Sequence, residues 1–241
     1  GSATVGATYT HNSVTYTVFE TVASANIIIL SGNAAPLASG TLTKASGTGD
    51  TTLTFIQSFA PKSLEVQAVA AGGGGSGISN GVGYVAGGNG TATIFNGVTA
   101  NAGGGSALDI PGAGGSAGAG AATYRIPGGQ GNGGSLASNT IPGGSGGGTF
   151  FGGNGAGGTS ASSGGNGALN TGAGGGGSGG NTVWSAGPMS GGGGGEYFFL
   201  KINNPVATYT YQIGVGGAKG DGTSADGGVG ADGMIIIKTE Y

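Results

Sequence analysis

The sequence predicts a mainly β protein with an ordered glycine-rich centre and almost no α-helix. Runs of β-branched and aromatic residues near both ends of the chain favour short strands. Gly makes up 65 of the 241 residues, and each Gly disfavours a helix by about 1 kcal/mol relative to Ala. Charged residues are only 6% and the net charge is −3. Because disorder goes with low hydrophobicity and high net charge, this composition favours an ordered chain.

The first segment, residues 3–60, reads as a small β module. Strands are expected at residues 8–10, 14–19, 26–30, 40–43 and 51–55, separated by turn residues such as those at 11–13 and 47–50. A module of about sixty residues is marginal as a lone monomeric domain, because it buries little surface on folding. We therefore predict that this module associates with copies of itself.

The second segment, residues 61–241, reads as a glycine-rich domain closed by a short β-sheet. Strands are expected at about 63–71, 196–202, 207–213 and 234–241, and they frame residues 72–195, where Asp109 and Arg125 are the charged residues. Glycine-only faces let extended chains approach closely and pair N–H with C=O, so we predict several packed polyglycine II passes. Ile-Pro-Gly occurs at residues 110–112, 126–128 and 141–143. One outward and one return pass per repeat would place the three Pro at the same end.

Several motifs resemble the glycine-rich tip domain of bacteriophage tail fibres, over about residues 62–241. They are a strand running into Gly72-Gly-Gly-Gly75, the segments 89–95, 99–105 and 209–217, and the closing Gly230-Ala-Asp-Gly before the apolar residues 234–237. Residues 9–55 are similar to a small β module also seen in tail-fibre proteins, notably at Ala38–Lys44 and 47–50.

This resemblance implies a polyglycine II sandwich and a homotrimeric fibre or a tip-mounted adhesin in the virion. Its loops would bind a host surface receptor, either an outer-membrane protein or a surface glycan. The opening Gly1-Ser2 is typical of a cleaved tag, so we expect a further N-terminal region that joins other tail proteins.

A polyglycine core has few side chains, so recognition should fall to large residues in the loops between passes. Aromatic side chains on rigid loops are frequent binding anchors. Phe150 and Phe151 are adjacent, so in an extended segment their rings would point in opposite directions. The predicted receptor-binding residues are Tyr84, Tyr124, Phe150, Phe151, Trp184 and Met189.

Catalysis, cofactors and metals find little support in the sequence. His11 is the one His and Cys is absent, while Asp221, Asp226 and Asp232 have spacings that fit neither calcium repeat and are typical of turns. The sequence contains no basic stretch of the kind that binds nucleic acid. The apolar run 27–30 is too short for a membrane span. The alternatives are a glycan-depolymerising enzyme with paired carboxylates, an ice-binding glycine-rich protein and a purely structural fibre segment.

Overall fold

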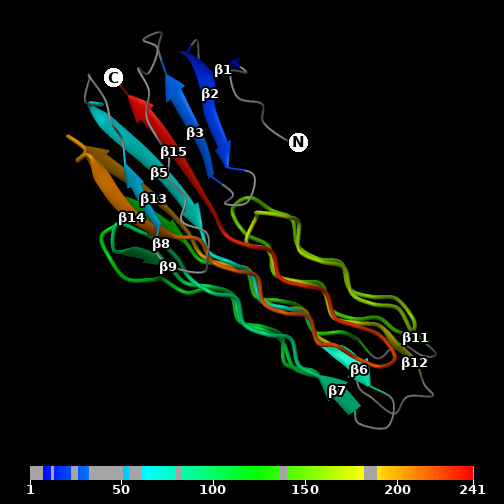
Figure 1. Ribbon diagram of the computed structural model, residues 1–241. Coiled ribbons are helices and arrows are strands. Elements are labelled where there is room, and N and C mark those ends of the chain that lie inside the picture. The colour runs from blue at the N-terminus through cyan, green and yellow to red at the C-terminus, as the bar shows by residue number, and fades with distance from the viewer. Residues whose placement is uncertain are drawn as a thin grey trace.

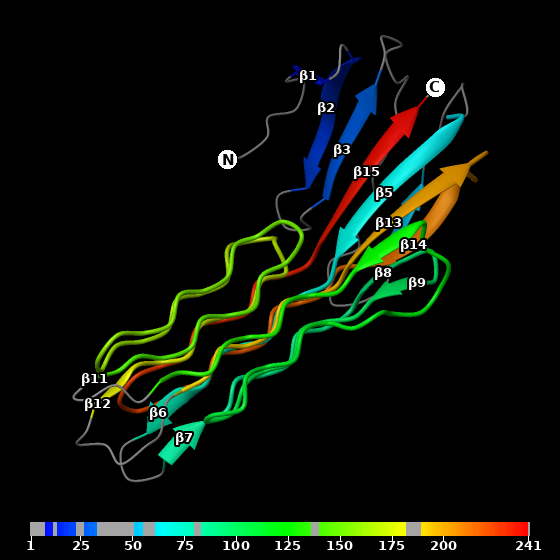
Figure 2. The same ribbon diagram turned by 180° about the vertical axis from the view of Figure 1, so that it is seen from behind.

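The computed structural model describes residues 8–11, 14–22, 27–32, 51–54, 61–79, 83–135, 140–181 and 189–240. These residues form strands and extended segments with no helix, which confirms the mainly β prediction. The molecule is elongated (Figures 1 and 2). Two β-sheets lie at one end, called here the sheet end, and a bundle of glycine-rich segments extends from them to the far end.

The larger sheet has seven strands in the order β1-β2-β3-β15-β5-β13-β10. Neighbouring strands are antiparallel except β3 and β15, which are parallel. The strands are β1 (Thr8–His11), β2 (Val14–Val22), β3 (Ile27–Gly32), β15 (Met234–Glu240), β5 (Ser63–Val69), β13 (Tyr197–Asn203) and β10 (Tyr124–Ile126).

The smaller sheet has four strands in the order β4-β14-β8-β9. They are β4 (Thr51–Thr54), β14 (Thr208–Gln212), β8 (Thr93–Phe95) and β9 (Val98–Ala100). Because β3 pairs with β15 and β4 pairs with β14, both sheets cross the predicted domain boundary between residues 60 and 61. The N-terminal strands thus complete sheets of the glycine-rich domain.

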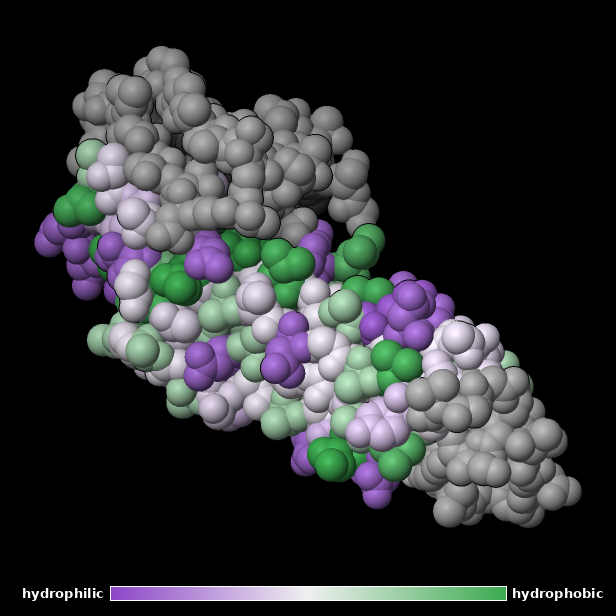
Figure 3. Space-filling model, turned by 60° about the horizontal axis from the view of Figure 1, so that its bottom comes forward, coloured by the Kyte–Doolittle hydropathy of each residue, from purple (hydrophilic) through white to green (hydrophobic). Residues whose placement is uncertain are grey.

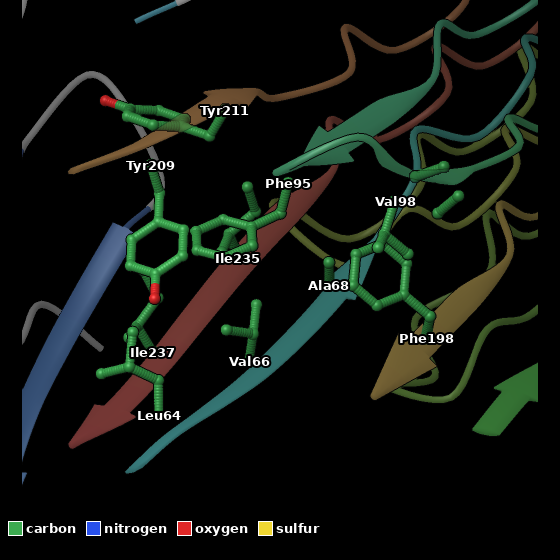
Figure 4. Close-up of a cluster of buried hydrophobic side chains, with 12 residues drawn as sticks. Leu64, Val66, Ala68, Phe95, Val98, Phe198, Tyr209, Tyr211, Ile235 and Ile237 are labelled. Atoms are coloured by element: carbon green, nitrogen blue, oxygen red, sulfur yellow. The ribbon is translucent and has the colours of Figure 1, made fainter. Parts of the chain in front are cut away.

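A side-chain core lies between these two sheets (Figure 4). Alternate residues of β5 and β15 point into it, as the period-2 geometry of strands requires. Phe95 stacks on Tyr209 with ring centroids 5.3 Å apart. Burying each large apolar side chain contributes about 1.5–3 kcal/mol. The core residues are Leu64, Val66, Ala68, Ala70, Phe95, Val98, Ala100, Phe198, Tyr209, Tyr211, Ile235 and Ile237.

Within the described residues, the bundle consists of twelve extended segments that are joined by backbone hydrogen bonds. In segment 70–76 the neighbouring segment that accepts from each backbone N–H group repeats every three residues. Ala70, Gly73 and Ser76 donate to segment 189–196, whereas Gly72 and Gly75 donate to segment 226–233. The other segments are 86–92, 101–106, 111–118, 127–135, 142–148, 153–158, 163–168, 173–179 and 213–220.

Three of these segments form the interior of the bundle. Segments 70–76, 173–179 and 189–196 each exchange hydrogen bonds with six others, and the remaining nine surround them. A Cβ added at Gly73, Gly176 or Gly192 would lie closer than 3.0 Å to backbone atoms of a neighbouring segment. Glycine is therefore required where backbones pack directly against each other.

The Ile-Pro-Gly repeats lie at alternating ends, so the prediction of one common end is wrong. Ile126 ends β10 in the seven-stranded sheet, and Pro127 starts a segment that leaves it. Ile141 ends β11 (Thr140–Ile141), which pairs with β12 (Gly180–Asn181) at the far end (Figure 2). Each repeat interval therefore holds one pass instead of two.

Candidate functional site

The exposed aromatic side chains mark the candidate binding surfaces. Tyr84, Tyr124 and Phe150 are 43%, 46% and 50% exposed. Tyr84 lies at the far end, in β7 (Gly83–Val85), which pairs with β6 (Gly77–Ser79) (Figure 1). Tyr124 lies in β10 of the seven-stranded sheet, and Phe150 contacts Tyr197 of β13. The predicted residues therefore occupy both ends of the bundle and do not form one surface.

Five aromatic residues at the sheet end form a cluster, called here the aromatic platform. Phe150 stacks on Tyr197 with centroids 4.2 Å apart, and Tyr124 stacks on Phe199 at 5.2 Å. Tyr197 also contacts Tyr124 at 5.9 Å and Phe151 at 5.7 Å. Tyr197 is fully buried, and it joins the two exposed rings into one arrangement.

Phe150 and Phe151 do not point in opposite directions, so that prediction is wrong. They lie in a turn in which the N–H of Gly152 donates to the carbonyl of Thr149 (2.9 Å). Gly152 has a φ of 75°, a conformation that favours glycine. The turn brings both rings against Tyr197, where they meet edge to face at 5.2 Å.

Hydrogen bonds fix the centre of the platform. The hydroxyl of Tyr197 donates to Oε1 of Gln67 (3.2 Å) and lies 3.5 Å from the hydroxyl of Tyr124. Burial, followed by the interaction with Tyr124, raises the pKa of Tyr197 above its usual value, so this hydroxyl stays neutral. Sequence reasoning missed Tyr197, Phe199 and Gln67. The available signal was the run of three aromatic residues Tyr197–Phe199, because the first and third of them share one face of a strand.

Two predicted site residues have other outcomes. Met189 is fully buried, so its side chain is not available at the surface and its assignment to the site is wrong. The reason is its place at the start of the enclosed segment 189–196, where the carbonyl of Met189 accepts from the N–H of Gly144 (2.8 Å). Trp184 lies outside the described residues.

The two charged residues of the glycine-rich region have separate roles. Arg125 donates to the buried carboxylate of Glu196 (2.8 Å) and to the carbonyl of Thr99 (2.8 Å). Glu196 also accepts from the N–H groups of Asn101 and Gly118. This ion pair joins the bundle to the sheets, whereas Asp109 is exposed in a turn.

The Asp residues near the C-terminus have bonding partners in the fold. Asp226 pairs with Lys219, and Asp232 accepts from the N–H of Gly216 (2.7 Å). Among the described residues, no three His, Asp or Glu side chains gather as potential metal ligands. The described part of the chain also has no helix that could cross a membrane.

Comparison with known proteins adds no assignment. The chain matches no protein-family model, no curated protein and no solved structure.

Proposed function

We propose that this protein is the receptor-recognising distal tip of a bacteriophage tail fibre, and that it adheres to a bacterial surface without catalysis. One observation carries the proposal. A bundle of hydrogen-bonded backbone extends away from the sheet end and carries few side chains of its own. The side chains displayed at its far end therefore come from turns and short strands. A rigid scaffold with binding residues in its connections is a common arrangement for recognition.

We also propose that the bundle packs as polyglycine II. This helix has three residues per turn and no internal hydrogen bonds, so successive N–H groups point to different neighbours. The donor period of three and the six neighbours around each enclosed segment support this packing. On the face shown in Figure 3, most of the coloured bundle surface is neither strongly hydrophilic nor strongly hydrophobic. Binding specificity then depends on a few larger side chains.

The far end is the surface that we propose to contact the receptor first. Tyr84 is its exposed aromatic residue in the described part of the chain. Trp184 belongs to the segment between β12 and segment 189–196, and we keep it as a proposed anchor from the sequence. Aromatic anchors offer a large contact area with little loss of side-chain entropy.

Binding to whole cells tests this function. Fluorescently labelled protein is incubated with a panel of bacterial strains, and bound fluorescence is measured by flow cytometry. We expect strain-specific binding, and Trp184→Ala should weaken it by about 2 kcal/mol if Trp184 is an anchor. The folded state of each variant is checked by circular dichroism. Absence of binding to every strain would contradict the proposal, as would release of reducing sugar ends or thermal hysteresis.

The assembly is proposed to be a homotrimer, on the resemblance to fibre proteins. The small size of residues 3–60 does not require self-association, because β3 and β4 already pair with strands of the glycine-rich domain. Light scattering at micromolar concentration measures the mass. A monomer would contradict the trimer without affecting the proposal that the protein binds cells.

A further inference from the structure

We propose that the aromatic platform at the sheet end binds a glycan, with sugar rings stacked on Tyr124 and Phe150. The platform lies at the opposite end of the bundle from Tyr84, so this is a second site beyond the far-end recognition proposed above. The inference rests on the proposed function only for the source of the glycan, which is a bacterial surface.

The geometry leaves one side of each exposed ring available. Tyr124 and Phe199 are stacked at an interplanar angle of 21°, and Phe150 and Tyr197 at 27°. Each exposed ring therefore has one face covered by an aromatic neighbour. Since Tyr124 and Phe150 are still about half exposed, we infer that the face of each ring away from its stacked neighbour is open to solvent. Both rings contact Tyr197, which joins them into one cluster.

The chemistry of the platform matches a ligand with apolar faces and hydroxyl edges. Ring faces suit the C–H surface of a sugar, and the hydroxyl of Tyr124 can both donate and accept at its rim. The neighbouring row on the same face of the sheet carries Lys201, Glu65 and Lys238. Glu65 lies 3.8 Å from Nζ of Lys201 and 3.6 Å from Nζ of Lys238. Glu240 also lies 3.7 Å from Nζ of Lys201, so two carboxylates compensate the two Lys, which favours an uncharged ligand.

The platform is held in place before any ligand binds. Tyr124 pairs with Phe199 in the register of β10 and β13. The turn that carries Phe150 is fixed by Thr149, whose hydroxyl donates to the carbonyl of Thr171 (2.5 Å). Because these rings are already fixed, the protein loses little side-chain entropy when a saccharide binds. A small contact area can therefore give measurable affinity for the saccharide.

The two exposed rings by themselves are too small for an interface between two copies of this chain. The half-exposed rings of Tyr124 and Phe150 offer roughly 100 Å² each, because a Phe or Tyr buries about 150–250 Å² in full. A specific protein interface needs about 800 Å² on each partner. One or two sugar rings fit the available surface.

A printed array of bacterial oligosaccharides tests the proposal, with lipopolysaccharide O-chains and capsular fragments as separate sets. The full chain is applied, and the best-bound oligosaccharide is then measured by titration calorimetry. We expect Tyr124→Ala and Phe150→Ala each to weaken binding at least tenfold, as the loss of an anchor does. Phe150→Leu keeps apolar bulk without the ring and should weaken binding similarly.

Two control variants separate this site from the far end. Tyr124→Phe keeps the ring and should retain most of the affinity, whereas Ile110→Ala, at an exposed apolar residue outside the platform, should leave saccharide binding unchanged. If no oligosaccharide binds, or if the platform variants bind as the parent does, the proposal is wrong. A lower mass of the platform variants in light scattering would also overturn it, since the rings would then join copies of the chain. Cell binding by the same protein tests the proposed function independently.

Discussion

The sheet end and the bundle exclude water by different means. At the sheet end, Leu64, Val66 and Phe198 fill the space between two sheets with side chains (Figure 4). In the bundle, Gly73, Gly176 and Gly192 leave no such space, and neighbouring backbones hydrogen-bond directly. The first region is stabilised mainly by apolar burial. The second depends on complete pairing of its backbone groups, because ordering glycine has a large entropic cost.

This difference determines what each region tolerates. A side-chain core accepts exchanges that conserve volume, usually at less than about 1.5 kcal/mol. At the glycines of the bundle interior there is no side-chain volume to exchange. Any Cβ there must displace a neighbouring backbone and the hydrogen bonds that it makes.

The largest effect is expected from Gly192→Ala. The new Cβ would overlap the carbonyl group of Gly73, and both residues lie in enclosed segments. Overpacking ordinarily costs about 1–3 kcal/mol, and we expect at least the upper value because the overlapped atoms are backbone. Urea denaturation measures it. The control is Gly148→Ala, where a Cβ has no neighbour within 4 Å. Equal stability of the two variants would refute backbone-only packing.

At the sheet end, Phe95→Ala is expected to lower the free energy of unfolding by about 3–5 kcal/mol through lost burial and a cavity. Phe95 is fully buried and stacks on Tyr209. Phe95→Leu should cost less than about 2 kcal/mol, because most of the apolar volume remains. Thermal and urea denaturation compare the pair. If Phe95→Leu were as damaging as Phe95→Ala, the two regions would not differ in their tolerance.

The junction of the two regions depends on Arg125. In Arg125→Gln the buried carboxylate of Glu196 loses its cation, which should cost about 3 kcal/mol. The double variant Arg125→Gln with Glu196→Gln should recover part of that loss, since no charge stays buried unpaired. A double-mutant cycle by denaturation gives the coupling. Additive effects would mean that the pair does not join bundle and sheets.

The smallest effect concerns alkaline pH. Burial raises the pKa of Tyr197 above 10.0, its ordinary value. The neutral hydroxyl is favoured in the folded state, so its contribution is fully present below pH 10 and is lost as pH rises beyond it. Tyr197→Phe should therefore lose less thermal stability between pH 9 and pH 11 than the parent does. Parallel melting curves would contradict this assignment.

The sequence alone determined the local conformation in each region, which is strands at the sheet end and extended glycine-rich passes in the bundle. Alternation of apolar residues in 63–71 predicted β5 with its buried face, and the apolar run 234–237 predicted β15, because both patterns are local. The density of Gly in residues 72–195 likewise predicted extended passes without helix, since each Gly acts on its own backbone.

Tertiary contacts set which segments meet and which end of the bundle each turn occupies. Gly73 bonds to Gly193, and glycine segments are nearly identical, so their composition does not specify their neighbours. The same holds for the site. Whether a turn lies at the sheet end or at the far end depends on how many passes precede it, so Tyr84 and Tyr124 lie at opposite ends. Met189 is buried because its segment is enclosed by others. The aromatic platform exists because Phe150 and Tyr197, far apart in sequence, meet at the point where the bundle joins the sheet.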